Sequence, residues 1–123
     1  AQFGMPGTFA PIADFELLET AVAIAREKGV RMPVGHVRSS DNFYDASGKT
    51  RDWAKMGVLC ADMEAAALYA NAAYRGKRAL SLLTIADSIV TGEELPAADR
   101  QTTFTQMMEI ALGVAVAMDK KAN

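Results

Sequence analysis

The sequence predicts an α/β fold with a largely parallel sheet, and three observations lead to this prediction. Short apolar segments alternate with segments of helical periodicity, which is the pattern of strands joined by covering helices. A hydrophobic fraction of 50% excludes a wholly disordered chain. The 123 residues are enough for one domain with a core of its own.

In the first half of the chain, the sequence predicts a loop, a helix and a strand, in that order. Residues 1–13 are punctuated by Gly and Pro, which favours a loop. Asp14 is a suitable N-cap for an amphipathic helix over residues 15–28, and Gly29 is a suitable residue to end it. Residues 33–38 then predict a strand, followed by a polar loop.

The middle of the chain predicts a short helix at residues 49–56 and a buried strand at residues 57–61. This strand passes directly into an alanine-rich helix at residues 65–74, which Gly76 ends. Strand and helix are therefore joined by only a few residues, so the loop between them is held at the end of the sheet.

The last part of the sequence predicts a strand at residues 79–86, which is apolar without clean alternation as in strands buried on both faces, and a helix from residue 97 to 118. The expected inner stripe of that helix is Phe104, Met107, Met108, Ala111 and Leu112. Three strands are few for an open sheet and leave an edge bare. Because the chain also lacks an initiator Met, we expect it to be a portion of a larger fold.

Composition excludes several classes of protein. A net charge of -2 argues against a polyanion-binding protein, which needs a basic surface. Cys60 is the single cysteine, so no internal disulfide is possible, and His36 is the single histidine, which excludes a multi-histidine metal site. We find no segment of membrane-spanning length and no signal peptide, and therefore expect a cytoplasmic protein.

Polar and aromatic side chains follow each predicted strand. Ligands of open α/β sheets bind outside the carboxyl ends of the strands, so these residues are expected to share one rim. Together they suit a small polar ligand with a flat ring. The residues are Asp41, Asn42, Phe43 and Tyr44 after the first strand, Asp62, Met63 and Glu64 after the second, and Asp87 and Ser88 after the third.

Structural interpretations compete with these functional ones. Asp62 and Glu64 open a helix, where the helix dipole favours acids, and on pattern alone this is the favoured interpretation. Asp87 could equally cap a turn, and Arg100 could be a solvated cation. Cys60 lies in an apolar run and is expected to be inert core.

Several segments resemble the nucleoside phosphorylase superfamily. D-M-E-A-A at residues 62–66 resembles its E-M-E-A-A segment, and T-I-A-D at residues 84–87 resembles its T-x-S-D segment. T-G-E-E at residues 91–94 and R-Q-T-T-F at residues 100–104 are similar to the bacterial hexameric purine nucleoside phosphorylases, as are I-A-D-F and N-F-Y earlier in the chain. The resemblance covers about residues 10–117, and Asp87 together with R-Q-T-T-F is its most specific part.

The resemblance implies a portion of a three-layer α/β/α fold with a mostly parallel or mixed central sheet. Residues 1–123 would be the C-terminal half of a single domain, with the N-terminal phosphate-binding half absent. The implied activity is that of a pentosyltransferase in purine salvage: reversible phosphorolysis of purine (deoxy)ribonucleosides, with phosphate as co-substrate and no other cofactor or metal. The implied assembly is a hexamer, built as a trimer of dimers.

The resemblance also implies roles for single residues. Glu64 would accept the ribose hydroxyl protons and Met63 would pack on the sugar. Phe43 would stack near the base, supported by Tyr44 and opposite Ala61 and the backbone of Asp62. Asp87 would donate a proton to purine N7, assisted by Arg100. A free aspartic acid is ionised at neutral pH, so this role requires that a closed pocket desolvate Asp87.

Some positions depart from the family pattern. Asp62 stands where Glu is common, and Ala86 stands where Ser is common. Ser88 and Val90 replace a His and an Arg, which leaves the preference between 6-oxo and 6-amino purines open.

Two alternative functions remain. A purine nucleosidase of the same superfamily would use water in place of phosphate, although the segment from Thr91 to Phe104 favours the phosphorylase. A non-catalytic half-subunit would bind a purine or a partner chain without turnover. Uridine phosphorylase is disfavoured because a pyrimidine has no N7 for Asp87 to protonate.

Overall fold

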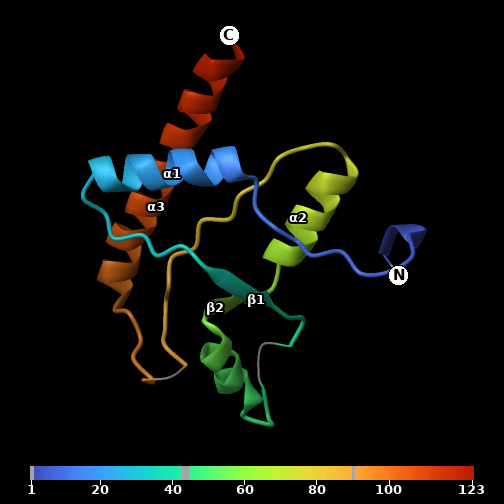
Figure 1. Ribbon diagram of the computed structural model, residues 1–123. Coiled ribbons are helices and arrows are strands. Elements are labelled where there is room, and N and C mark those ends of the chain that lie inside the picture. The colour runs from blue at the N-terminus through green and yellow to red at the C-terminus, as the bar shows by residue number, and fades with distance from the viewer. Residues whose placement is uncertain (1, 43–44, 90) are drawn as a thin grey trace.

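The computed structural model describes residues 2–42, 45–89 and 91–123 and has the predicted α/β composition (Figure 1). Within these residues, no helix is both long and apolar enough to cross a membrane. The elements in chain order are a 3₁₀ turn η1 (Gln2–Gly4), helix α1 (Phe15–Glu27), strand β1 (His36–Ser39), a 3₁₀ segment η2 (Lys49–Met56), strand β2 (Val58–Asp62), helix α2 (Ala65–Tyr74) and helix α3 (Ala97–Ala122).

The sheet consists of β1 and β2, which pair in parallel. His36 lies opposite Val58 at one end and Ser39 opposite Asp62 at the other, with a shift of register after His36. A parallel pair needs a crossover between its strands, and η2 lies within that connection. The predicted strands at residues 33–38 and 57–61 are thus confirmed as strands, with β1 starting three residues later than expected. The expected burial of the second was wrong, since the residues of β2 alternate between partly buried and exposed and Leu59 is 55% exposed.

The strand predicted at residues 79–86 is not part of the sheet in the described chain, and this prediction was wrong. The segment is nevertheless strand-like, because its side chains alternate. Leu80 and Leu82 pack against the core, whereas Leu83 and Ile85 are 42% and 54% exposed. A strand is completed by hydrogen bonds to a neighbour. Within the described residues no strand pairs with this segment, so it does not form part of a sheet.

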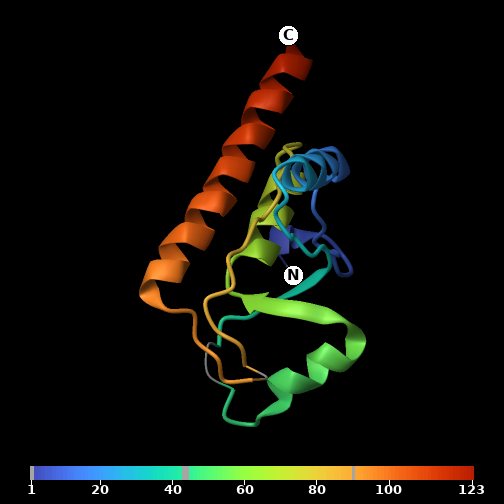
Figure 2. The same ribbon diagram turned by 90° about the vertical axis from the view of Figure 1, so that its left-hand side faces the viewer.

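The core lies where α1 crosses α3 (Figures 1 and 2). Its buried residues are Ala21 and Ala25 of α1 and Ile110 and Val114 of α3, between 0% and 7% exposed. The small side chains of α1 allow the two helices to approach closely. Gly113 contributes to the same contact, since a Cβ atom there would lie 3.2 Å from the Cδ1 atom of Ile24.

The inward face of α3 differs from the predicted stripe. Ile110 and Val114 are buried, whereas four residues at spacings of four form an exposed row. The prediction included Phe104, Met108 and Leu112 of this exposed row, because both faces of α3 carry apolar side chains and the sequence pattern does not distinguish them. The position of α1, which no local pattern encodes, decides which face is covered. The exposed row is Phe104, Met108, Leu112 and Val116, each between 48% and 64% exposed.

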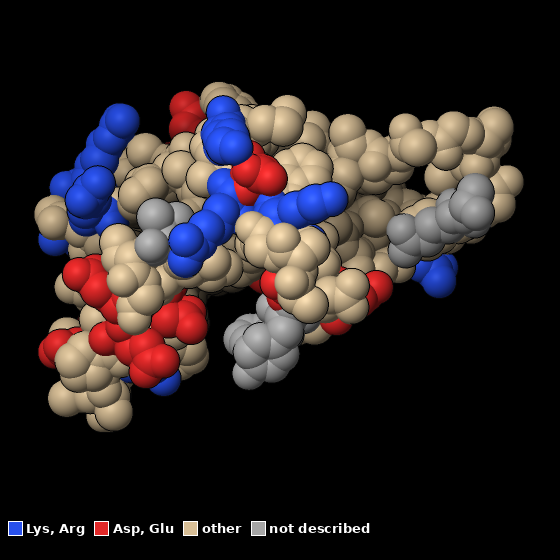
Figure 3. Space-filling view, turned by 90° about the horizontal axis from the view of Figure 1, so that it is seen from below, with Lys and Arg blue, Asp and Glu red and all other residues tan. Residues whose placement is uncertain are grey.

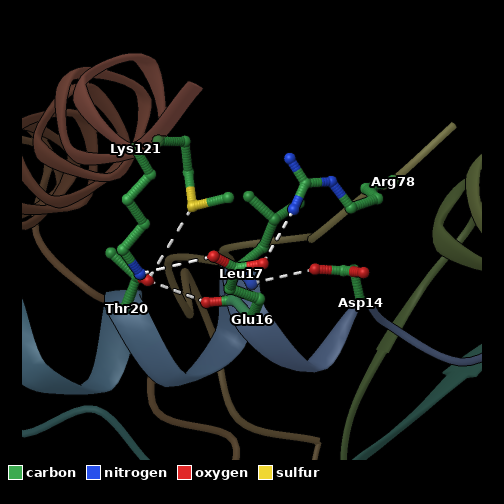
Figure 4. A network of polar contacts seen from close by, with 7 residues as sticks. Asp14, Glu16, Leu17, Thr20, Arg78 and Lys121 are labelled. Carbon is green, nitrogen blue, oxygen red and sulfur yellow. Dashed lines mark hydrogen bonds and ion pairs between the residues drawn. The ribbon is translucent and has the colours of Figure 1, made fainter. Parts of the chain in front are cut away.

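Polar contacts fasten α1 at its start and to distant parts of the chain (Figure 4). The Asp14 carboxylate accepts a hydrogen bond from the Leu17 backbone N–H at 3.0 Å, which confirms the predicted N-cap. Glu16 forms ion pairs with Arg78 at 3.0 Å and with Lys121 at 3.4 Å. At the other end Gly29 has a φ of +68°, as expected of the residue that ends the helix.

Candidate active site

Two polar side chains join the carboxyl ends of β1 and β2 to the start of α2. The Ser39 hydroxyl donates to the Asp62 carboxylate at 2.6 Å, and the backbone N–H of Ala65 donates to the other carboxylate oxygen at 2.8 Å. The backbone N–H of Ala66 donates to the Ser39 oxygen at 3.0 Å. Asp62 therefore binds the first backbone N–H of α2 from a position two residues before the N-cap Glu64, where a negative charge also interacts favourably with the helix dipole.

Ser39 was not identified as part of the site from the sequence. Its position in the sequence could have pointed to this role, because Ser39 directly follows a predicted strand and a hydroxyl group there can reach the end of the neighbouring strand. Its partner Asp62 also affects Cys60. Burial, followed by the negative charge of Asp62, raises the pKa of the Cys60 thiol. The thiol is therefore protonated at neutral pH. The expectation that Cys60 belongs to the core was wrong, since it is only partly buried and lines the hollow described below.

Glu64 is placed differently from Asp62, although only one residue separates them. The Glu64 side chain is exposed, and its Oε2 atom accepts a hydrogen bond of 3.3 Å from the Met63 backbone N–H. Within the described residues the carboxylate makes no ion pair. Met63 is 42% exposed beside it. Of the two acids that precede α2, Glu64 is thus the one whose oxygens are available to a ligand.

Asp87 lies at the end of the extended segment 79–86, next to a tight loop. It forms an antiparallel bridge with Glu94, and the backbone N–H of Leu95 donates to the Ala86 carbonyl at 2.7 Å. The Asp87 residue is exposed. The desolvation that a proton donor needs is therefore not supplied by the described residues of this chain.

Arg100, in the first turns of α3, does not contact Asp87. Its Nε atom donates to the Leu95 carbonyl at 2.7 Å, and the described residues contain no ion pair between Arg100 and Asp87. Leu95 is the link between them, because its N–H binds Ala86, the residue before Asp87. The guanidinium of Arg100 thus binds a carbonyl and makes no ion pair with Asp87 among the described residues.

A hollow of about 420 Å³ brings part of the predicted site together. Its lining consists of residues 58–62 of β2, residues 83–89, and three residues of η2. Asp62, Asp87 and Ser88, which follow two of the predicted strands, thus line one hollow, and Ala61 lines it as well. Met63, Glu64 and Arg100 are not among its lining residues, and Phe43 and Tyr44 lie outside the described residues.

The charges around this end of the molecule are mixed. Figure 3 shows acidic and basic side chains in neighbouring groups on the lower face, without a surface of one sign. Across the residues that the structure describes, His, Cys, Asp and Glu side chains form no group of three that could hold a metal ion. The chemistry available here is that of carboxylates, a guanidinium and backbone groups.

Comparison with known proteins identifies relatives over almost the whole chain. The model of the family described as "Phosphorylase superfamily" matches residues 4–118. The DeoD-type purine nucleoside phosphorylase of Geobacillus sp. (strain WCH70) is 49% identical over 108 residues, which are 88% of this chain and 46% of the relative. The protein of the same description from Bacillus subtilis (strain 168) is 51% identical over 104 residues, 85% of this chain and 45% of the relative. The protein of the same description from Clostridium novyi (strain NT) is 52% identical over 108 residues, which are 87% of this chain and 46% of the relative. The chain spans about half the length of the curated relatives it matches.

Proposed function

Because the chain belongs to the phosphorylase superfamily, we propose that it acts as part of a purine nucleoside phosphorylase. The reaction is the reversible conversion of a purine (deoxy)ribonucleoside and phosphate into a free purine and (deoxy)ribose 1-phosphate. The observation that carries this proposal is the identity of about half of all positions with enzymes of that description, over 85–88% of the chain.

The bond to be broken joins C1′ of the sugar to N9 of the purine. A phosphate oxygen attacks C1′, and the electron pair of the C1′–N9 bond passes to the purine. A proton given to N7 by Asp87 neutralises the charge that develops there. General acid catalysis of this kind is worth about 10²–10⁴ in rate. The place of Asp87 at the edge of the hollow supports this role.

Glu64 is proposed to bind the sugar. Its two oxygens can accept hydrogen bonds from the 2′- and 3′-hydroxyl groups side by side, each worth roughly 1.5–3 kcal/mol. Its exposure, in contrast to the internally bound Asp62, supports this assignment. Met63 is proposed to pack on the sugar.

Arg100 is proposed to assist the proton transfer. The guanidinium leaves the Leu95 carbonyl and approaches Asp87, where its positive charge stabilises the carboxylate left after the proton has moved. The movement exchanges one hydrogen bond of 2.7 Å for an ion pair, and Leu95 already links the two segments involved.

The remaining parts of the site are proposed to come from elsewhere in the subunit. Residues 1–123 supply the C-terminal half, and the phosphate-binding groups belong to the other half. The assembled enzyme is proposed to be a cytoplasmic hexamer of three dimers, without a metal or an organic cofactor. The shorter length of this chain relative to its relatives supports the division into halves.

The function is tested by measuring hypoxanthine release from inosine, with and without phosphate, by the chain together with the complementary half of a relative. Release that depends on phosphate is expected. Release without phosphate would identify a nucleosidase instead, and binding of purine without release would identify a non-catalytic module.

The role of Asp87 is tested with Asp87→Asn on two substrates. The variant should lose about 10²–10⁴ in rate on inosine. It should lose much less on 7-methylinosine, whose base leaves without a proton on N7. Equal losses on the two substrates would contradict proton donation.

A further inference from the structure

Arg51 of η2 places a guanidinium beside the loop that follows Asp87. Its Nη2 atom donates a hydrogen bond of 3.1 Å to the backbone carbonyl of Ile89, which lies 38 residues further along the chain. Ile89 directly follows Ser88, the residue after the proposed proton donor. Arg51, Asp87 and Ile89 all line the hollow of about 420 Å³. The contact therefore brings a cation from a distant segment to the same part of the site as Asp87.

The segment that carries Arg51 is attached on both sides of this residue. The preceding residue, Thr50, donates from its hydroxyl group to the Asp45 carboxylate at 2.8 Å. At the other end Gly57, with a φ of +79°, leads directly into β2. A free arginine side chain samples many rotamers, so an anchored backbone and a hydrogen bond at its tip both restrict where the guanidinium lies.

The loop after Asp87 does not carry a positive charge of its own. Residues 87–95 contain three acids and no Lys or Arg. Among the described residues that line the hollow, Arg51 is the only basic one, and it makes no ion pair there with Asp62 or Asp87. A guanidinium has five N–H donors, and within the described residues the Ile89 carbonyl is its one acceptor. The group therefore has donors left for a ligand.

A guanidinium distinguishes purines by the group on C6. N7 and the C6 substituent lie on the same edge of a purine, where a 6-oxo purine offers two acceptors and a 6-amino purine offers one acceptor and one donor. Arginine is a donor only. A base whose N7 faces Asp87 has its C6 substituent next to that carboxyl group. An arginine on this side can therefore bind O6 but cannot bind an amino group.

From these observations we infer that Arg51 is a specificity-determining residue, which donates to O6 and selects 6-oxo purine nucleosides over 6-amino ones. The inference rests on the proposed function and deepens it by naming the substrate class. The Ile89 carbonyl holds one N–H of the guanidinium, and the bond to O6 uses another. Because the donor is charged and a 6-amino purine leaves it unpaired, the preference is at least about tenfold.

A purely structural role is the alternative interpretation of Arg51. In that case its side chain only attaches η2 to the loop after Asp87. Loss of the attachment would displace Asp87 in the same way for every substrate, and the rates on inosine and adenosine would fall together. The ratio of the two rates therefore separates recognition of O6 from attachment of the loop.

The test compares inosine with adenosine, using this chain assembled with the complementary half of a relative. The original chain should show a kcat/KM at least about tenfold higher for inosine. Arg51→Met, which keeps a long side chain without donors, should lose most of this preference. Lys55→Met is the matched control, because Lys55 is a cation of the same segment that pairs with Asp52 at 2.7 Å and does not line the hollow. It should keep the ratio of the original chain.

Binding of the free bases is a second readout, which does not require turnover. Hypoxanthine carries O6 where adenine carries an amino group. Isothermal titration calorimetry on the same assembly should therefore show hypoxanthine bound at least about tenfold more tightly than adenine. Arg51→Met should weaken the binding of hypoxanthine and leave that of adenine nearly unchanged, whereas Lys55→Met should alter neither.

Several results would overturn the inference. These are equal use of the two nucleosides by the original chain, a preference that Arg51→Met retains, a preference that Lys55→Met also loses, or no binding of either base. The proposed function is distinguished by comparing the two readouts. Selective binding of hypoxanthine without phosphorolysis of inosine would refute the chemistry alone. Phosphorolysis with the same ratio of substrates in Arg51→Met would refute the role of Arg51 alone.

Discussion

The helical region and the sheet region of this molecule differ in how completely they are closed. Where α1 crosses α3, Ala21 is fully buried and Ile110 is 3% exposed. In the sheet, Leu59 is 55% exposed. A helix satisfies its own backbone, whereas a strand depends on its neighbours. Among the described residues, the contact between α1 and α3 therefore buries its apolar side chains more completely than the sheet does.

The largest effect is expected from Ile110→Ala, which removes a buried side chain from the closed region. It should lower the free energy of unfolding by about 2–5 kcal/mol, measured by urea denaturation. Leu112→Ala on the same helix is the control. Its side chain is 64% exposed, so its effect should stay within about 0.5 kcal/mol. Equal losses in the two variants would mean that α3 presents a different face to α1.

The next effect concerns the junction of the sheet with α2. Asp62→Ala removes the acceptor of two hydrogen bonds and should cost about 1–2 kcal/mol. Glu64→Ala should leave thermal unfolding nearly unchanged, since its side chain is exposed. The opposite order of the two effects would contradict the separation of a structural acid from a ligand-binding acid.

A smaller effect is expected at Glu16, which connects the closed region to Arg78 and Lys121. Both ion pairs are about half exposed, so Glu16→Gln should cost no more than about 1 kcal/mol. The loss should shrink as salt is added, because salt screens exposed charges. A loss that is unchanged in high salt would point to packing in place of charge.

The smallest effect is local and depends on pH. Hydrogen bonds from Ser47 and Thr50 hold the pKa of Asp45 far below its ordinary value. Because the folded pKa is depressed, this stabilisation is present above the pKa of an unfolded aspartate and is lost as the pH falls through the folded value. Below about pH 4 the amide of Thr50 should exchange faster, with global unfolding unchanged. Asp45→Asn should remove this pH dependence.

The same distinction between self-contained and dependent elements explains which predictions succeeded. The bounds of α1 and α2 were predicted closely because their signals are local: the Asp14 cap, the Gly29 stop and the alanine-rich run that starts at Ala65. The strand predicted at residues 79–86 was wrong, because a strand is defined by backbone hydrogen bonds to a neighbouring strand, and such pairing is not encoded in the residues of the segment itself.

The candidate site divides in a similar way. That Asp62 and Asp87 share one hollow followed from their positions after strand-like segments. The sequence did not predict that Asp62 is bound by Ser39 and Ala65 while the Glu64 side chain is exposed, because both acids precede the same helix. Only the tertiary contact between two strand ends separates their roles. The inner face of α3 was missed for a comparable reason, since it depends on where α1 crosses.

The bond between Ser39 and Asp62 has a consequence for molecular recognition. By locking the two strand ends and the first turn of α2 together, it fixes the backbone from which Glu64 projects. A carboxylate on a rigid corner loses little conformational freedom when it binds a diol, so more of each hydrogen bond appears as affinity. If Glu64 binds the sugar as proposed, weakening this lock in Ser39→Ala would therefore loosen that binding through entropy, although Ser39 itself does not touch the proposed ligand.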